Sequence, residues 1–262
     1  MTTRVETMQV GGVVTLDIAN AVGDVVVRDA DAAEVTVALS GDGNLVDGTS
    51  IDLVADRVTV RSPKTGRRFA RRMDVTVTMP PGGVALIRVA AGSIRVRSRV
   101  TEAELETSAG DVRMDEPVEE VSIRVASGNV TLADVSGSGD IDTANGDVRI
   151  RAAGDVRVST ASGDIRVDEV RRTGRLKSAS GDLTIGRFAG TDLDAKTMSG
   201  DVRVGIATRM ELKASVKTLS GDFRNKIQPS PGEKLGSASL RVSSFSGDIT
   251  LTSVEPPVGE PR

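Results

Sequence analysis

The sequence contains no cysteine, histidine, tryptophan or tyrosine, and it has four phenylalanines among 262 residues. Because thiols and imidazoles are absent, the chain has no disulfide, no thiolate nucleophile, no histidine base and no nitrogen or sulfur ligands for zinc, haem or iron–sulfur clusters. Chemistry is left to oxygen groups, and a core has to be built from valine, isoleucine, leucine and alanine. We therefore expect no cofactor.

Charge of one sign and long apolar runs are missing as well. The 34 lysines and arginines nearly balance 37 aspartates and glutamates, so the net charge is −3 and nothing in the overall composition points to nucleic acid. Residues 1–14 carry Arg4 and Glu6 and lack the apolar stretch of a secretory signal, and no run of about 18 apolar residues could form a spanning helix. The sequence predicts a cytoplasmic protein without an integral membrane segment.

An internal repeat dominates the sequence. A small residue, a glycine, an aspartate or similar polar residue and an apolar residue recur nine times, as in Ser162-Gly163-Asp164-Ile165. Successive repeat glycines are 18, 18, 18, 17, 18, 19, 21 and 26 residues apart. The nine glycines are Gly92, Gly110, Gly128, Gly146, Gly163, Gly181, Gly200, Gly221 and Gly247. A period near 18 residues is typical of a repeat architecture.

Apolar residues alternate with polar ones after each glycine, which predicts strands and not helices. One apolar column lies two positions after the glycine and runs from Val112 to Ile249. A second column lies four positions after the glycine and runs from Met114 to Leu251, so both columns share one face of the predicted strands. A further short apolar pattern fills the rest of each period. Each repeat is therefore expected to contain two or three short strands.

A unit of about 18 residues cannot bury an apolar face alone, but units stacked about 4.8 Å apart in a parallel ladder make one continuous core. The sequence therefore predicts an all-β protein, a β-solenoid in which like side chains stack on like. An antiparallel β-sandwich is the alternative, because short strands at regular spacing suggest it too. We expect residues 91–254 to form the regular solenoid repeats, 1–90 an irregular N-terminal β region continuous with them, and 255–262 a disordered tail.

The repeat glycines are assigned a structural role in turns. A tight turn between short strands needs a residue at positive φ, and a Cβ at that place would collide with the coil above or below. Two positions before the glycine, small residues give way late in the chain to Met198, Leu219 and Phe245. We expect these larger side chains to close the end of the core, in which case Phe245→Ala would lower stability markedly.

Carboxylates form the most suggestive column for function. Seven of the nine repeats carry one directly after the glycine, namely Asp111, Asp147, Asp164, Asp182, Asp201, Asp222 and Asp248. Stacked carboxylates could bind calcium or act as paired acids on a polysaccharide. Arginine stands two residues further on in six repeats, however, and such charges pair across neighbouring strands. The column is therefore interpreted as structural, and we predict no metal-binding and no catalytic residue.

A basic segment lies between residues 61 and 72. It carries six positive charges and no acid, namely Arg61, Lys64, Arg67, Arg68, Arg71 and Arg72. Such a cluster could contact an anion or an acidic partner. The alternative is a solvated hairpin loop between strands near 57–61 and 73–79, with Pro63 and Gly66 as turn formers. With Phe69 as its single aromatic residue, the segment offers no platform for stacking bases.

Three features resemble the putative-adhesin β-strand-repeat family, a bacterial domain family of unknown function. They are the Gly-Asp-Val opening at Gly23, the Met-Pro-Pro-Gly element at 79–82 and the Ser-Gly-Asp-apolar copies between 92 and 251. The resemblance covers nearly the whole chain. It implies a β-solenoid module with a protein or envelope-associated partner, and it brings no catalytic residues.

We therefore expect a non-enzymatic interaction or scaffold protein, adhesin-like by its family resemblance. A surface adhesin or glycan-binding module is one alternative, and a cation-dependent or carboxylate-catalysed polysaccharide enzyme is another. The sequence has no Gly-x-Ser-x-Gly elbow, no Ser-x-x-Lys pair and no phosphate-binding loop, so enzyme templates other than paired carboxylates are excluded. The partner and the oligomeric state do not follow from the sequence.

Overall fold

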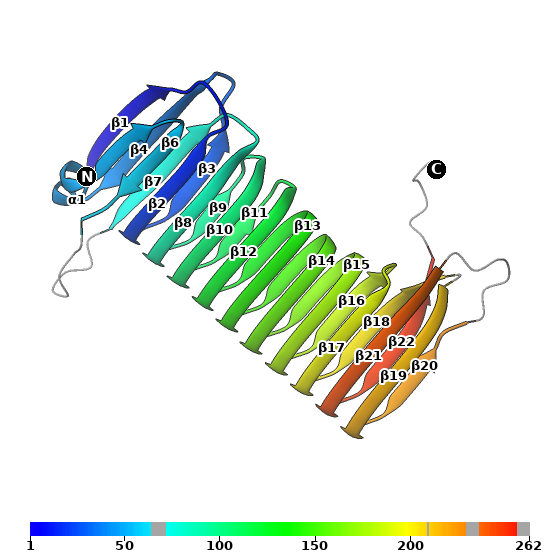
Figure 1. The fold of residues 1–262 in the computed structure, drawn as a ribbon. Coiled ribbons are helices and arrows are strands. Elements are labelled where there is room, and N and C mark those ends of the chain that lie inside the picture. Colours follow the sequence, from blue (N-terminus) through cyan, green and yellow to red (C-terminus); the bar gives the residue numbers. More distant parts are fainter. Residues whose placement is uncertain (64–71, 209, 229–235, 256–262) are drawn as a thin grey trace. The chain divides into compact units, whose positions relative to one another are not determined.

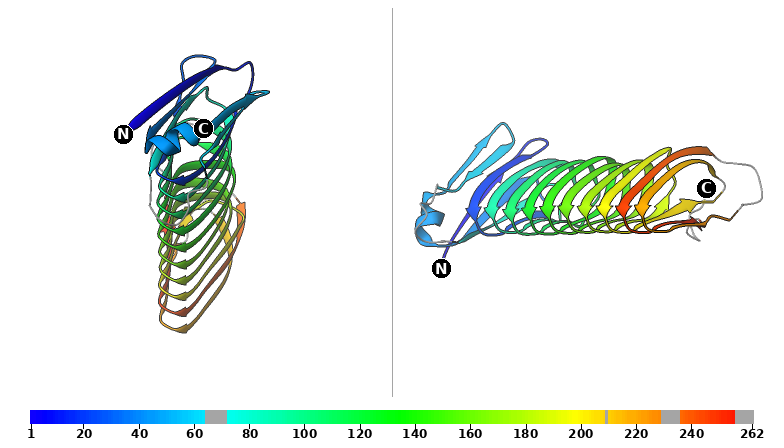
Figure 2. Two further views of the ribbon diagram at one scale, coloured as in Figure 1. Left: turned by 90° about the vertical axis from the view of Figure 1, so that its left-hand side faces the viewer. Right: turned by 90° about the horizontal axis from the view of Figure 1, so that it is seen from below.

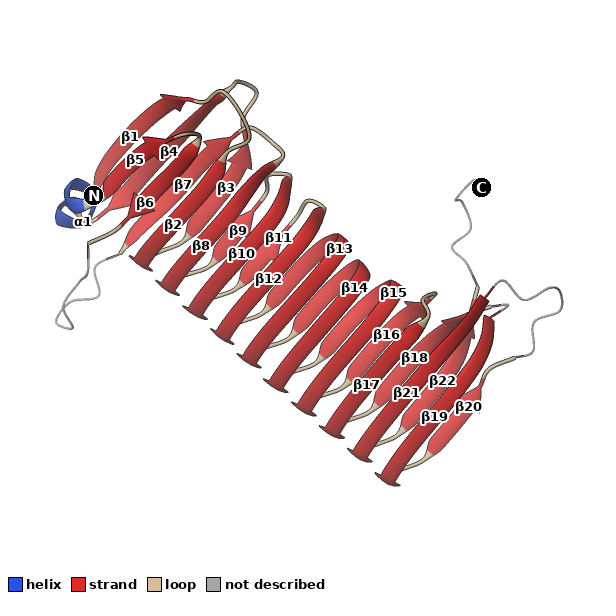
Figure 3. Cartoon of the chain, viewed as in Figure 1, coloured by secondary structure: helices blue, strands red, loops and turns tan. Residues whose placement is uncertain are grey.

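The computed structural model describes residues 1–63, 72–208, 210–228 and 236–255. In these residues it contains twenty-two β-strands and one six-residue helix, which confirms the all-β prediction (Figure 3). The chain forms two compact units. Unit 1 comprises residues 1–134 and 141–144, and unit 2 comprises residues 135–140 and 145–262. The predicted tail beyond residue 255 lies outside the described residues.

Among its described residues, unit 1 contains twelve strands and one short helix, and part of a thirteenth strand. They are β1 (Thr2–Gln9), β2 (Thr15–Val22), β3 (Val25–Asp29), β4 (Glu34–Gly41), β5 (Ser50–Val54), β6 (Arg57–Arg61), β7 (Met73–Met79), β8 (Gly83–Ala91), β9 (Ile94–Val96), β10 (Val100–Ala109), β11 (Val112–Met114) and β12 (Val118–Ser127), with the helix α1 (Gly43–Gly48). Strand β13 (Val130–Asn145) contributes residues to both units.

Two parallel ladders run through unit 1. One contains β6, β2, β8, β10 and β12 in that order, and the other contains β7, β3, β9, β11 and residues 130–132 of β13. We call one strand from each ladder, with the turn between them, a coil. From β8 to β13 the coils follow the sequence, whereas β2 and β3 lie between the coil of β6 and β7 and the coil of β8 and β9. The parallel register is that of stacked coils and not of an antiparallel sandwich.

The first coil of unit 1 is covered by antiparallel strands. Strand β4 pairs antiparallel with β7 and with β1, and β5 pairs antiparallel with β6. Helix α1 is the short helix that follows β4 (Figure 2). It buries Leu45 and Val46. Asp42 caps this helix, because its carboxylate accepts a hydrogen bond from the backbone N–H of Asn44. The irregular β region before residue 90 thus forms the first coils of unit 1 and their cover.

The strands of unit 2 again form two ladders. Its strands are β14 (Val148–Ser162), β15 (Ile165–Ser180), β16 (Leu183–Phe188), β17 (Asp192–Ser199), β18 (Val202–Ala207), β19 (Met210–Ser220), β20 (Phe223–Lys226), β21 (Gly236–Ser246) and β22 (Ile249–Val254). β14 and β15 each span both ladders, because their early residues pair with the early residues of the next coil and their late residues with its late residues.

The last coils of unit 2 do not follow the order of the sequence. Strand β21 lies between β17 and β19, and β22 lies between β18 and β20 (Figure 1). The final stretch of the chain is therefore inserted as the second-last coil, and β19 with β20 forms the end of the stack. A uniform order of successive coils, as the sequence alone suggests, is wrong at this point.

The two apolar columns predicted after each glycine form the core. Their members are buried in both units, with exposed fractions of 2% or less from Val112 and Met114 through Ile249 and Leu251. Phe223 is the exception at 47%, because it lies in the last coil of unit 2 and no further coil covers it among the described residues. The core is aliphatic, and Phe188 is its one fully buried aromatic side chain among the described residues.

Candidate functional site

Each repeat glycine adopts a positive φ, between 140° and 152°. A Cβ built on Gly110 would meet the carbonyl oxygen of Gly92 well inside 3.0 Å, and the same collision occurs between Gly181 and Gly163. In unit 2 the order of these contacts is 146, 163, 181, 200, 247 and 221, which matches the exchanged order of the last coils. The glycines thus serve two physical needs, the positive φ of the turn and the close approach of consecutive coils.

The column of aspartates forms a continuous hydrogen-bonded ladder inside each unit. The Oδ1 atom of Asp164 accepts a hydrogen bond of 2.8 Å from the backbone N–H of Asp182, and Asp182 accepts one of 2.8 Å from that of Asp201. The equivalent bonds, each from a backbone N–H to a side-chain oxygen, join in unit 2 Asp164 to Asp147, Asp248 to Asp201 and Asp222 to Asp248. In unit 1 they join Asp24 to Asp74, Ser93 to Asp24, Asp111 to Ser93 and Asn129 to Asp111. These side chains join one coil to the next.

The second carboxylate oxygen of several ladder aspartates contacts an arginine. Arg203 lies 3.2 Å from Asp182 Oδ2 and 2.7 Å from Asp201 Oδ2, and Arg224 bridges Asp222 and Asp248 in the same way. Both oxygens of Asp182, Asp201 and Asp248 are therefore committed to protein groups. Among the residues that the structure describes, no group of three or more carboxylates is arranged to hold a metal ion.

A column of buried hydroxyl groups three positions before the glycine was not singled out from the sequence. Thr107 donates a hydrogen bond of 3.0 Å to the carbonyl oxygen of Gly92, and Thr197 donates one of 3.1 Å to that of Gly181. Ser178, Thr218 and Ser244 make the equivalent bonds in their coils. The recurrence of serine or threonine at this position was the available signal, and these bonds satisfy carbonyl groups at the tightest point of the turn.

The basic segment is described only at its ends. Lys64, Arg67, Arg68 and Arg71 lie outside the described residues, so an anion contact there stays a prediction. Strands β6 and β7 belong to different ladders, and the alternative of a hairpin between them is therefore wrong. Arg72 lies 2.8 Å from Asp24 and 2.9 Å from Asp74, and these carboxylates raise the pKa of its guanidinium, with Asp74 having the larger effect.

Arg61, at the other end of the segment, takes part in an ion-pair cluster around one buried carboxylate. The carboxylate of Asp17 on β2 is 9% exposed and lies 2.7 Å from both Arg61 and Arg57 of β6. The hydrogen bond from Arg61 is the main reason that the pKa of Asp17 is lowered; burial opposes this effect and Arg57 adds to it. Asp17 lies outside the periodic repeat, and no sequence signal pointed to this cluster.

Three large apolar side chains lie exposed in neighbouring strands of unit 2. Met198 on β17, Phe245 on β21 and Leu219 on β19 are 63%, 60% and 73% exposed. The strand registers place them side by side, because their neighbours Thr197, Ser244 and Thr218 are paired in that order. We call these three residues the apolar ladder. The prediction that they close the core is wrong, since side chains alternate along a strand and the buried hydroxyl column precedes them.

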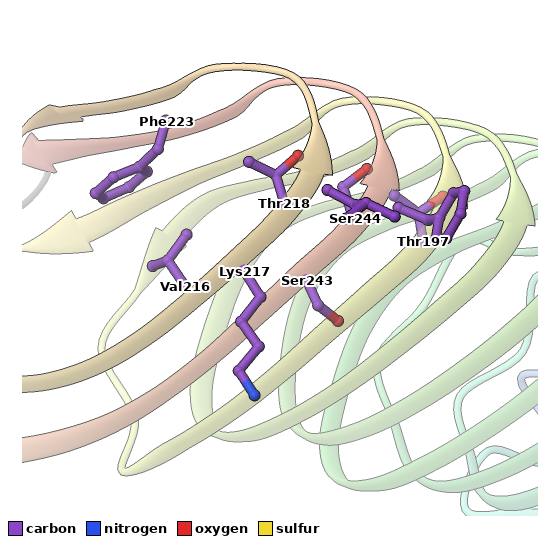
Figure 4. A pocket seen from close by; sticks show the side chains of 9 residues that line it. Thr197, Val216, Lys217, Thr218, Phe223, Ser243 and Ser244 are labelled. Atoms are coloured by element: carbon purple, nitrogen blue, oxygen red, sulfur yellow. The ribbon is translucent and has the colours of Figure 1, made fainter.

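A cavity of about 750 Å³ opens at the last coil of unit 2 (Figure 4). Val216 and Thr218 of β19 and Phe223 of β20 line it, together with residues of the two preceding coils, Thr197 and Ser244 among them. Val216 and Phe223 correspond in register to the buried Val242 and Ile249 of the coil next to them. The cavity therefore marks the place where the aliphatic core of unit 2 reaches the surface.

These features define a class of all-β protein whose coils are held together by glycine turns and a hydrogen-bonded aspartate ladder. The chain belongs to the Toastrack DUF4097 family, whose model matches residues 13–256. No curated protein matches it. No helix among the described residues has the length and apolar character needed to cross a membrane.

Two similar solved structures come from bacteria. A protein named "putative adhesin" from Parabacteroides distasonis is 14% identical, with a TM-score of 0.52 over 95% of this chain and 97% of that chain. Another "putative adhesin", from Bacteroides fragilis, is 13% identical with a TM-score of 0.47 over the same shares. At these identities the first comparison establishes similarity of fold, and neither transfers a function.

Proposed function

We propose that this chain is a β-solenoid interaction module without enzymatic activity, and that it binds a protein partner through the apolar ladder of unit 2. The observation that carries the proposal is the contiguity of Met198, Phe245 and Leu219 on three paired strands. Scattered exposed apolar side chains are ordinary, but a contiguous group on a soluble surface marks an interaction site. Met198 and Leu219 flank Phe245 in register, and aromatic residues and methionine are enriched at protein interfaces.

The other repeats supply an internal contrast. The position two residues before the glycine holds Ser108, Ala126, Ala161 or Ala179 elsewhere, and each of these residues is exposed. A position that only had to face solvent would not need three large apolar side chains in the coils β17, β21 and β19. The exposure of these side chains costs solubility and brings no packing in the folded chain, which supports a role in binding.

The hydrogen bonds of the aspartate ladder support a structural role for these carboxylates and not a catalytic one. A general acid or a calcium ligand needs an oxygen available to substrate or metal, whereas Asp182 and Asp201 use both oxygens within the protein. We expect the melting temperature to be the same in calcium and in chelator. A rise of several degrees with calcium would favour the cation-dependent alternative.

The binding test uses the full chain with a photoreactive amino acid at Phe245, expressed in the cells it comes from. The expected result is a crosslink to a defined partner protein, lost when the other two ladder residues are changed in M198S/L219S. The matched control carries the photoreactive group at Ala126, in the same column of unit 1, and should give no such crosslink. Equal crosslinking from both positions, or retention in M198S/L219S, would contradict the proposal.

A surface adhesin is the second candidate, because the chain shares its fold with the P. distasonis protein named "putative adhesin". Our proposal places the chain inside the cell instead. Fractionation of cells that carry a tagged full-length chain separates the two, since an adhesin must be accessible to protease added outside intact cells. Protection from the protease is the expected result.

A further inference from the structure

The last coil of unit 2 ends in a strand whose outer edge is free to pair, among the described residues. Strand β19 pairs with β21 along its full length of eleven residues and with no other strand among the described residues. An edge of this length, without proline or a bulge, exposes a row of backbone N–H and C=O groups that readily pair with another strand. Its core-facing residues Leu212 and Val216 are only partly buried, whereas Leu240 and Val242 of the adjoining β21 are 0% and 2% exposed.

The outward residues of β19 carry a charge pattern that is complementary to itself. Glu211, Lys213, Ser215 and Lys217 alternate with Leu212, Ala214 and Val216. If two copies of β19 pair antiparallel about Ala214, Glu211 of each copy lies opposite Lys217 of the other. Lys213 then faces Ser215, and no like charges meet. Opposite charges in directly facing positions stabilise an antiparallel pair.

Neighbouring registers lack this match. A pairing centred on Lys213 places that lysine opposite its own copy, and a pairing centred on Ser215 places Lys213 opposite Lys217. Side chains alternate between the two faces of a strand. The apolar residues of both copies therefore stay on the core side only when the pair is centred on a residue, and not between two residues. A pairing centred on Leu212 also places Glu211 opposite Lys213, but it joins only residues 210–214 of each strand. The charge pattern and the length of the pair together favour the register centred on Ala214, which joins residues 210–218.

The same register covers the cavity at the end of the core. Leu212 of the second copy lies opposite Val216, and Met210 of the second copy lies opposite Thr218. Val216 and Thr218 both line the cavity of about 750 Å³, with Phe223 beside them. Aliphatic side chains would thus meet the apolar lining, and burial of that lining supplies the favourable free energy of association.

We infer that two copies of this chain associate through β19 as a closed two-fold dimer, with an antiparallel β19–β19 pair centred on Ala214. A two-fold interface uses the same surface on both copies, so assembly stops at two. The dimer uses the strand edge of the last coil, whereas the apolar ladder faces outward from the strands. Leu219 and Phe245 of the apolar ladder also line the cavity that the dimer covers, so the two proposals share part of one surface and are told apart by their variants.

A charge exchange on the full-length chain tests the inference, with the dissociation constant measured by analytical ultracentrifugation. K217E places a glutamate opposite Glu211 of the second copy, and E211K places a lysine opposite Lys217. Each should raise the dimer dissociation constant at least about tenfold, and the double variant E211K/K217E should restore it. Lys177 shares the column of Lys217 in register on β15, and K177E should leave association unchanged.

Three outcomes would overturn the inference. They are a native chain that stays monomeric at about 100 µM, a dimer that both single variants leave intact, and assemblies that grow beyond two copies with concentration. Circular dichroism of each variant shows whether it folds, and since both changed side chains are exposed on the native strand, folding is expected. Loss of the photocrosslinked partner with an intact dimer would refute the proposed function alone.

Discussion

The first coil of unit 1 and the last coil of unit 2 differ in how their outer strands are covered. In unit 1 the strands β6 and β7 are each continued by an antiparallel strand, and Met73 and Val75 in that coil are fully buried. In unit 2 the strands β19 and β20 have no such cover among the described residues, and Phe223 is 47% exposed. A repeat fold needs a cap at a free end, and the open last coil therefore motivates the inferred pairing with a second copy.

The largest expected effect concerns the three phenylalanines of unit 2, which differ in exposure. Phe188 is fully buried, Phe223 is 47% exposed and Phe245 is 60% exposed. Phe188→Ala should lower the free energy of unfolding by about 3–5 kcal/mol, Phe223→Ala by about 1 kcal/mol and Phe245→Ala by less than about 0.5 kcal/mol. Denaturant unfolding of the three variants measures this series. An equal loss for Phe188 and Phe245 would contradict the difference between covered and open positions.

A glycine inside the stack should be less tolerant than one outside it. Gly181→Ala combines a positive φ of 151° with a collision against the carbonyl of Gly163, and should cost about 3 kcal/mol. Gly82 has a φ of 87° but nothing within 4 Å of a new Cβ, so Gly82→Ala isolates the backbone strain at about 1 kcal/mol. Similar midpoints of denaturation for the two variants would show that coil contact is not what requires the glycine.

The covered end of unit 1 should also respond to pH through Asp17. A carboxyl whose pKa is lowered in the folded chain stabilises the fold above its unfolded value, near 3.9, and loses that contribution as the pH falls towards the lowered value. Asp17→Asn should therefore cost about 1–3 kcal/mol at pH 7, and the difference from the native chain should shrink below about pH 4.

Unfolding of both proteins between pH 7 and pH 2 measures that difference. Asp52→Asn, at an exposed position on β5, is the matched control and should match the native chain throughout. A constant difference for Asp17→Asn across this range would mean that its charge does not stabilise the covered end.

The periodic part of the molecule could be predicted from the sequence because the physical demand repeats. Every coil needs a residue at positive φ with no Cβ, so glycine recurs, and the aliphatic columns recur with it. The outward position of Phe245 could also have been predicted from the sequence. Leu240 and Val242 show that the even-numbered residues of this strand face the core, so Phe245 faces outward. The prediction that Phe245 closes the core is wrong because the alternation of side chains along the strand, and not residue size, decides which side chains face the core.

Two features could not be predicted from the repeat, namely the order of the last coils and the ion-pair cluster of Asp17. The coils centred on Gly221 and Gly247 have nearly identical signatures, so their columns fit either order in the stack, and the wide spacing of 26 residues was the only hint. The cluster of Asp17 with Arg57 and Arg61 joins strands about 40 residues apart without any repeat. Non-periodic long-range contacts of this kind need coordinates.

The most direct test of the stacking uses the absence of native cysteine. Paired residues of adjacent parallel strands have Cα atoms about 4.8 Å apart, within the range of a disulfide, whereas strands two steps apart are separated by roughly 10 Å. On oxidation, M198C/F245C should form an intramolecular disulfide and M198C/L219C should not. A disulfide in M198C/L219C and none in M198C/F245C would show that the coils follow the order of the sequence, and would contradict the inserted last coil.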